Sequence, residues 1–134
     1  MGRTSMEGPV YGAKSLLYYC QRETIGTGST DVEQGQITVP ATEDWYITNV
    51  SAYSTTAGTT GSVNVLKGTT TILGSAITLS AGADVKGTIT TTPGEDEGKL
   101  VAGGSVLSVQ ATVGATTAAT NVQVSVFGYI RYKR

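Results

Sequence analysis

The chain has 134 residues, a net charge of −1, one cysteine and no histidine. Its length fits one domain, and 14% charged residues with 18 glycines is typical of short strands joined by tight turns, not of a helical bundle or a disordered tail. The lack of histidine excludes Ser/His/Asp and Cys/His catalysis, and the small net charge gives no basis for nucleic-acid binding. We therefore expect neither an enzyme nor a cofactor site.

Residues 1–14 are predicted to form an extended arm, because they contain Gly2, Gly8, Pro9 and Gly12 but few residues suited to a core. At full extension such an arm reaches roughly 45 Å, far enough to contact a neighbouring molecule. A terminus without a role is the alternative. The arm holds no apolar run of signal-peptide length, so we expect no secretion and no membrane anchor.

Residues 13–23 allow both a helix and a strand, since Leu16, Leu17 and Cys20 have helical spacing. The adjacent tyrosines Tyr18 and Tyr19 and the lack of capping residues favour a strand. The single cysteine cannot form an internal disulfide, and its apolar neighbours predict a buried structural thiol.

Residues 24–35 are rich in glycine and are predicted to form a loop that crosses between sheets. A short strand at residues 36–39 ends at Pro40, and a long strand covers residues 45–56. Strict alternation would place Ile47 and Val50 of the long strand on opposite faces, so a β-bulge near Thr48 and Asn49 is expected if both are buried.

Short apolar segments separated by glycine turns predict further strands at residues 63–66, 72–73, 77–79, 84–91 and 100–101. A polar loop at residues 92–98 carries Glu95, Asp96 and Glu97. These acids could hold Ca²⁺, but they lack the spacing of a dedicated calcium loop, and solvated turn acids are the favoured interpretation.

Residues 105–113 and 121–133 are predicted to pair as a hairpin at the centre of a sheet. Both segments alternate apolar and polar residues with a period of two, as a strand with one buried face does. In the second segment Val124 and Val126 face the core, whereas Phe127, Tyr129 and Arg131 face outward.

The spacing of the strands and turns predicts an all-β fold, an antiparallel β-sandwich of jelly-roll type at residues 15–134 behind the arm at residues 1–14. The outward aromatic residues of the last strand require a cover, either the arm or a second subunit. The predicted partner-binding residues are Arg3, Pro9, Val10, Tyr11 and Lys14 of the arm, with Phe127, Tyr129 and Arg131 of the last strand.

Four segments in this order, QITVP (36–40), WYITNV (45–50), LVAGGSVLSV (100–109) and residues 122–132, resemble the jelly-roll decoration or cement proteins of tailed bacteriophage heads. The layout is also similar to trimeric fibre-head and C1q-like domains. The resemblance is one of pattern, and it assigns no functional residue. It implies a virion protein, made in the bacterial host cytoplasm, that binds the major capsid protein on the capsid exterior and joins capsomers. A homotrimer is expected, with a dimer as the alternative.

The competing hypothesis is a carbohydrate-binding or adhesion module of a phage fibre or tail on the same scaffold. It requires an exposed Trp45 as a stacking platform or a cation at Glu95, Asp96 and Glu97. A tryptophan that begins a strand is more often a core residue, which favours the first hypothesis.

Overall fold

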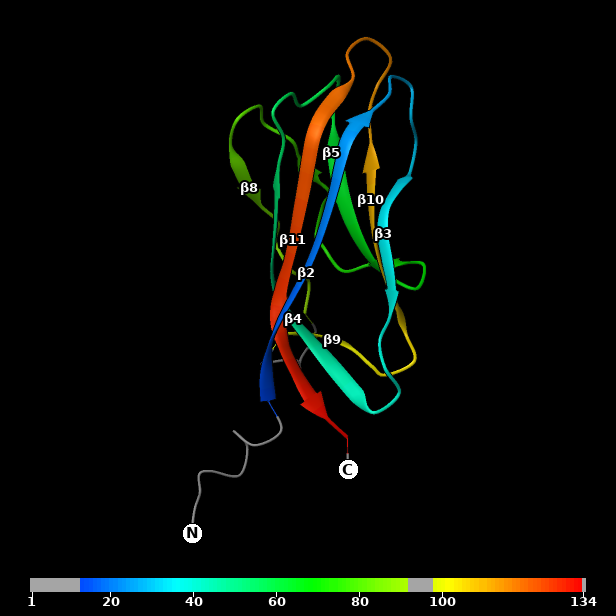
Figure 1. The fold of residues 1–134 in the computed structure, drawn as a ribbon, viewed down its shortest axis with the longest axis vertical. Coiled ribbons are helices and arrows are strands. Elements are labelled where there is room, and N and C mark those ends of the chain that lie inside the picture. Colours follow the sequence, from blue (N-terminus) through cyan, green and yellow to red (C-terminus); the bar gives the residue numbers. More distant parts are fainter. Residues whose placement is uncertain (1–12, 92–97, 134) are drawn as a thin grey trace.

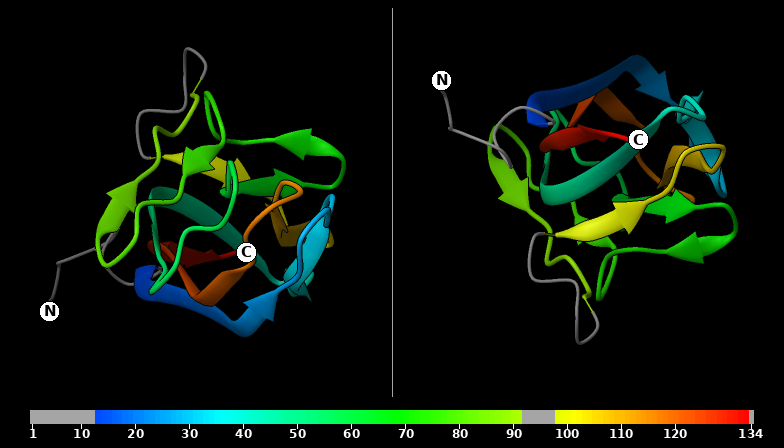
Figure 2. Two further views of the ribbon diagram at one scale, coloured as in Figure 1. Left: turned by 90° about the horizontal axis from the view of Figure 1, so that it is seen from above. Right: turned by 90° about the horizontal axis from the view of Figure 1, so that it is seen from below.

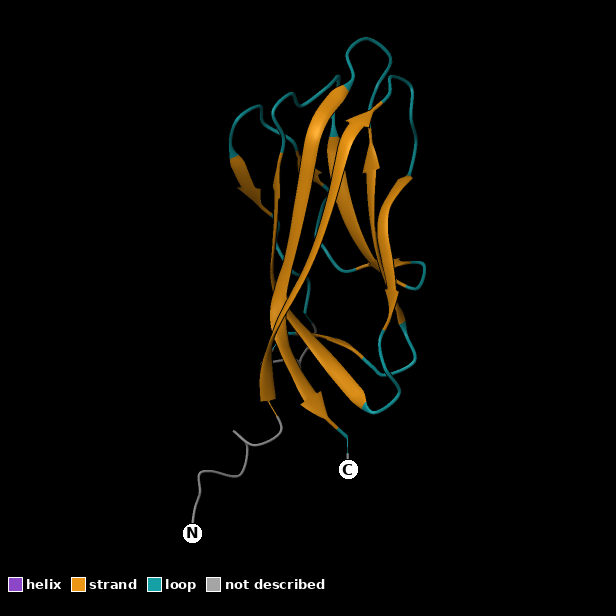
Figure 3. Ribbon diagram, in the orientation of Figure 1, coloured by secondary structure: helices purple, strands orange, loops and turns teal. Residues whose placement is uncertain are grey.

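The structure, a computed structural model, describes residues 13–91 and 98–133. In these residues two antiparallel sheets pack face to face, and loops make up the rest (Figure 1, Figure 3). The all-β sandwich predicted from the sequence is confirmed. No helix in this part of the chain is long and apolar enough to cross a membrane.

The first sheet, here called the β11 sheet, has the order β2-β11-β4-β8, with β9 also paired to β4. Its strands are β2 (Ala13–Ile25), β11 (Ala119–Tyr132), β4 (Glu43–Tyr53), β8 (Asp84–Lys86) and β9 (Lys99–Val101). The second sheet, here called the β10 sheet, has the order β3-β10-β5-β6, with β7 also paired to β5. Its strands are β3 (Val32–Thr38), β10 (Val106–Thr112), β5 (Ser62–Lys67), β6 (Thr70–Thr71) and β7 (Ile77–Thr78).

The strand pairs are nested along the chain. β2 pairs with β11, β3 with β10, β4 with β8 and β9, and β5 with β6 and β7. The first strand of each pair alternates between the two sheets, so the connections wrap around the core. This nested order is that of a jelly roll, as the sequence predicts.

The predicted hairpin of residues 105–113 and 121–133 is wrong. β10 is central in one sheet and β11 is central in the other, and Figure 2 shows them as parts of different layers. Leu107 and Val109 of β10 and Val124 and Val126 of β11 are fully buried between the layers. A period of two identifies which face of a strand is apolar but not which strand lies beside it, and here the two apolar faces meet across the core.

The β-bulge predicted near Thr48 and Asn49 is present. On β11 Phe127 pairs with Asn49 and Gly128 pairs with Ile47, so Thr48 is the extra residue of β4. The bulge allows Ile47 and Val50 to be buried together, with exposed fractions of 0% and 1%. β4 also approaches β11 so closely here that a Cβ atom at position 128 would collide with the Tyr46 carbonyl, and glycine meets this constraint.

Several boundaries differ from the sequence prediction. β2 is a strand that begins at residue 13, as predicted, but it continues to Ile25, two residues beyond the predicted end. β3 begins at Val32, inside the predicted loop, and the predicted strand at residues 84–91 ends at Lys86. The predicted strand at residues 72–73 is wrong, because the strand there, β6, covers Thr70–Thr71, and Ile72 and Leu73 are buried outside the named strands. Burial of these short segments depends on neighbours that are distant in the sequence, which local patterns do not reveal.

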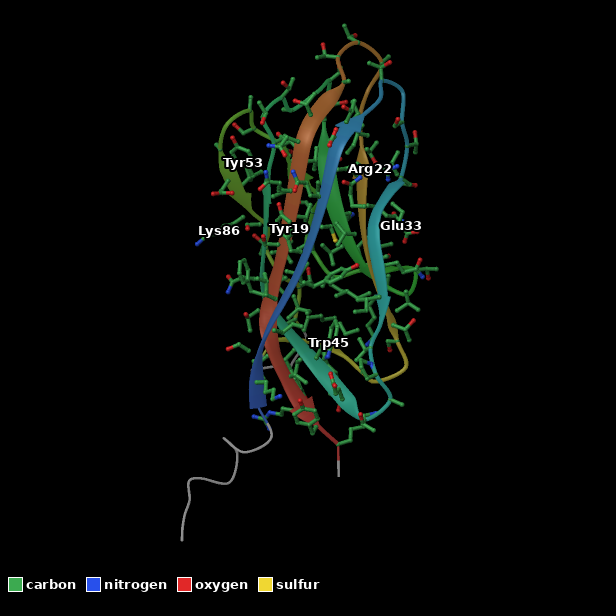
Figure 4. All side chains as sticks on the ribbon, viewed as in Figure 1. Tyr19, Arg22, Glu33, Trp45, Tyr53 and Lys86 are labelled. Atoms are coloured by element: carbon green, nitrogen blue, oxygen red, sulfur yellow. The ribbon has the colours of Figure 1, made fainter. Side chains whose placement is uncertain are left out.

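The edges of the two sheets meet at β2 and β3. Cys20 is buried at this seam, with 6% of its surface exposed, as predicted for a structural thiol. A Cβ atom at Gly35 of β3 would lie 2.6 Å from its Sγ atom, so the thiol occupies the space that glycine leaves. Burial raises the pKa of Cys20, and burial together with the neighbouring Cys20 raises the pKa of Tyr18 to about 12. Arg22 closes the seam by donating from Nη1 to the Glu33 carbonyl at 2.6 Å (Figure 4).

Truncation of a core leucine should destabilise the fold far more than truncation of an outward one. We expect Leu107→Ala, at a fully buried position, to lower the free energy of unfolding by about 2 to 5 kcal/mol. Leu17→Ala, at a position that is 61% exposed, should lower it by less than about 1 kcal/mol. Urea unfolding in dilute protein measures both values. Equal effects would contradict the assignment of the faces.

The pKa of Tyr18 predicts a loss of stability in alkali. Above its ordinary pKa of 10.0 the unfolded chain releases the Tyr18 proton, whereas the folded protein keeps it up to about pH 12. The folded state then binds more protons, so this contribution to stability is present below pH 10 and is lost as the pH rises toward 12. We expect Tyr18→Phe to lose less stability than the wild type between about pH 9 and pH 11. Urea unfolding across this range is the measurement, and parallel pH profiles would contradict the prediction.

Candidate interaction surface

The outward side of the β11 sheet is rich in aromatic and aliphatic side chains. Leu17, Tyr19 and Phe127 have exposed fractions of 61%, 48% and 40%, high values for large apolar groups. Leu17 and Phe127 are direct cross-strand partners, and Tyr19 is the partner of the adjacent outward residue of β11. We name this surface the aromatic face and define it by Leu17, Tyr19, Tyr46, Phe127, Tyr129 and Arg131.

The sequence prediction identified only the β11 part of this face. Leu17 and Tyr19 were missed, although the strand assigned to residues 13–23 contained the signal. In a strand, Leu16 and Cys20 lie on one side and Leu17 and Tyr19 on the other, so both sides of β2 are apolar. Two apolar sides on a strand at the edge of a sandwich indicate that both sides make contacts.

Tyr129 and Arg131 are packed within the molecule. The rings of Tyr46 and Tyr129 stack with centroids 5.1 Å apart and planes 9° from parallel. The Arg131 guanidinium lies over both rings, with Cζ 5.8 Å from the Tyr46 centroid and 5.7 Å from the Tyr129 centroid. The sequence predicts that the arm or a second subunit covers the outward rings of β11. For Tyr129 the neighbouring strand supplies a further contact, since Tyr46 of β4 stacks on its ring.

Small side chains lie beside these large ones. Tyr19, Ser125, Ser51 and Lys86 are consecutive cross-strand partners on β2, β11, β4 and β8. Both serines are half-buried, and the pairing order places them between the larger side chains of Tyr19 and Lys86, which Figure 4 labels. The aromatic face therefore has a bulky row at Leu17 and Phe127 and, next to it on β11 and β4, a row of small residues.

Amide side chains close the face at the end near the β10–β11 connection. Asn121 accepts hydrogen bonds at Oδ1 from Gln21 Nε2 at 2.7 Å and from Gln123 Nε2 at 3.0 Å. Its Nδ2 atom donates to Thr55 Oγ1 at 3.1 Å. Asn121 adopts a left-handed backbone with φ of 52°, a conformation that asparagine tolerates better than most residues. These bonds hold the outward side chains of β2 and β11 in fixed positions.

The outward side of the β10 sheet has a different character. Alternation along its central strands places these side chains outward: Gln36, Asn64, Leu66, Val106, Ser108 and Gln110. Leu66 and Val106 are the large apolar side chains among them, and both are half-buried. A polar outer side is usual for a sandwich, so the aromatic face is the exceptional one.

Trp45 does not form the exposed stacking platform that the carbohydrate-binding hypothesis requires. Trp45 is only 5% exposed, and its Nε1 atom donates to Glu43 Oε1 at 2.9 Å. The favoured interpretation of Trp45 as a core residue is confirmed. The acids Glu95, Asp96 and Glu97 lie outside the described residues, and within those residues no three metal-binding side chains gather.

The predicted arm residues are largely outside the description. Arg3, Pro9, Val10 and Tyr11 belong to residues 1–12, which the structure does not describe. Lys14 lies in β2, with its Nζ atom 5.7 Å from the centroid of the Tyr132 ring. It pairs with Ile130 on the inward side of the sheet, away from the aromatic face.

No protein-family model matches this chain, and no curated protein matches it. Among solved structures, the chain is similar to a chain in a structure of infectious bursal disease virus Gx strain, with a TM-score of 0.41 and 11% identity over 91% of this chain and 36% of that one. For the Gt strain the TM-score is 0.38 with 13% identity, over 90% and 38% of the two chains. This chain thus spans little more than a third of the viral chains, and the likeness carries no argument about function.

The two outward rings of β11 should differ in their effect on stability. Tyr129→Ala loses the stack with Tyr46 and the contact with Arg131, whereas Phe127→Ala removes an exposed ring. We expect Tyr129→Ala to cost about 1 kcal/mol more free energy of unfolding than Phe127→Ala. Urea unfolding of both variants in dilute protein tests this difference. An equal or reversed order would show that the stack does not hold the face together.

Proposed function

We propose that this chain is a non-catalytic structural protein of a bacteriophage virion, a decoration or cement protein on the outside of the capsid. In this proposal its subunits associate through the aromatic face and dock on the major capsid protein. The observation that carries the proposal is the exposure of Leu17, Tyr19 and Phe127 as neighbours on one rigid sheet.

Burial of this surface would be favourable. Removing apolar area from water contributes about 25 cal/mol per Å², and aromatic side chains bring large areas with little loss of conformational entropy. Tyrosine, phenylalanine and arginine are also the residues that protein interfaces favour. The sheet beneath is fixed by pairing on both sides of β11, so the face is preorganised for a partner.

The location on a capsid is supported by the resemblance of the sequence pattern to decoration proteins. The jelly-roll order of the strands agrees with the fold that this resemblance implies. The contact with the shell is assigned to residues 1–12, and this part of the proposal depends on the sequence alone. A carbohydrate-binding function finds no support at Trp45, since that ring is buried.

The proposal predicts two separable defects. The double variant Leu17→Ala with Phe127→Ala should weaken self-association while the fold persists, because both side chains are exposed in the single chain. Deletion of residues 1–12 should leave self-association intact but reduce binding to shells, because the proposal assigns the shell contact to these residues and the subunit contact to the aromatic face. Sedimentation of each protein, with and without empty phage heads that lack accessory proteins, measures both effects.

The matched control is Tyr132→Ala, which truncates a ring of similar exposure, 43%, away from the aromatic face. It should retain both self-association and binding to heads. A wild-type protein that remains monomeric and does not bind heads would refute the proposal. A deletion variant that binds heads undiminished would refute the assigned role of residues 1–12.

A further inference from the structure

We propose that the occupant of the aromatic face is the same face of a second copy, packed across a two-fold axis with the strands of the two copies antiparallel. The unit that this chain forms is then a dimer rather than the trimer expected from the resemblance. This inference rests on the proposed self-association and adds its geometry.

Symmetry provides the first argument. A patch that meets itself does so across a two-fold axis, whereas a trimer needs two different complementary patches on each subunit. Outside the aromatic face, the other broad outward side in the described residues is that of the β10 sheet, where the large apolar side chains of the central strands, Leu66 and Val106, are both half-buried. This side offers no exposed apolar counterpart to Leu17 and Phe127. The aromatic face itself is the complement available.

The arrangement of bulky and small side chains on the face provides the second argument. A two-fold axis that lies between the sheets, perpendicular to the strands and level with Val126, places Phe127 of one copy over Ser125 of the other. The same axis places Leu17 over Tyr19 of the other copy, because these residues are the cross-strand partners of Phe127 and Ser125. Phe127 of each copy thus meets the other's Ser125, Asn49 meets Ser51, and Leu17 meets Tyr19.

Charge complementarity agrees with the antiparallel direction. Arg131 and Lys133 lie at one end of the face beside Asp44, which leaves that end net positive. Glu23 and Asp84 lie toward the opposite end, and both are exposed, whereas Lys86 lies level with Ser125 near the middle of the face. Reversing the strands brings the positive end of each copy to the acidic end of the other. A parallel arrangement would place like charges together.

The size of the face is sufficient. Residues 121–131 of β11 extend over roughly 35 Å, and four strands cover about 19 Å, so the projected area is on the order of 650 Å². Because side chains protrude from the sheet, the solvent-accessible area of the face is larger than this projected area. The accessible area therefore approaches the roughly 800 Å² per partner that a stable interface buries.

The experiment exchanges bulky and small residues. Phe127→Ser leaves a gap, and Ser125→Phe places two rings against each other, so each single variant should raise the dimer dissociation constant about tenfold or more. The double variant, Ser125→Phe with Phe127→Ser, should recover dimerisation, because the two-fold axis again places each ring over a serine. Sedimentation equilibrium measures the constants, and Tyr132→Ser is the control that should leave them unchanged.

A cross-linking measurement does not depend on these substitutions. The Cα atoms of Ser125 in the two copies would lie about 12 Å apart, from ~6.8 Å along the strands and ~10 Å between the sheets. We expect Ser125→Cys to form covalent dimers with a short bismaleimide, while Gln110→Cys on the outward side of the β10 sheet should not. Cys20 is buried in the native protein and does not compete.

The outcomes separate this inference from the function on which it rests. A wild-type monomer refutes self-association itself. A trimer, a double variant that fails to recover, or absence of the Ser125→Cys cross-link overturns the two-fold geometry while self-association stands. A monomer that binds phage heads through Leu17 and Phe127 also overturns it, because the occupant would then be the shell.

Discussion

The packing of β10 against β11 across the core is the contact on which the rest of the molecule depends. Leu107, Val109, Val124 and Val126 are fully buried there, and each strand is central in its own sheet. Once one side of β11 is committed to the core, the period of two commits its other side to the surface. The position and orientation of Phe127 thus follow from where the valines are buried. The aromatic face is a direct consequence of the core and not an addition to it.

The bulge at Thr48 sets which residues of β4 face the core and which face outward on either side of it. Without the extra residue, either Ile47 or Val50 would point away from the core, and Tyr46 would lose its place opposite Tyr129. Gly128 lets the backbones approach closely enough for this register to hold. The bulge therefore lets both Ile47 and Val50 point into the core, and it also places Tyr46 opposite Tyr129, where Arg131 covers the two rings. The stack takes part of the apolar surface out of water within the single chain and leaves Leu17, Tyr19 and Phe127 exposed.

The two outer sides of the sandwich differ in chemical character. The outward side of the β10 sheet carries amides and hydroxyl groups with the half-buried Leu66 and Val106, whereas the β11 sheet exposes rings and a leucine. For a protein whose proposed function is to join other molecules, a rigid patterned surface serves as the functional site. Such a site acts through shape and buried area, so its important residues are those that a search for catalytic groups overlooks. Leu17 is the clearest case, because it is 61% exposed and packs beside Phe127.

The sequence by itself determined the longer strands, the inward and outward residues of β11, the bulge and the sandwich class, because these follow from local alternation and from the need to bury apolar side chains. It did not determine which strands are neighbours. The segments of β10 and β11 are equally consistent with a hairpin and with two facing sheets, and only the closure of the whole core selects the second arrangement. The same limit applies to the surface: the sequence placed Tyr129 outward, but the pairing of β4 with β11 decided that Tyr46 covers it. Contacts between strands distant in the chain are set by the tertiary structure, since a strand pattern specifies its faces and not its partners.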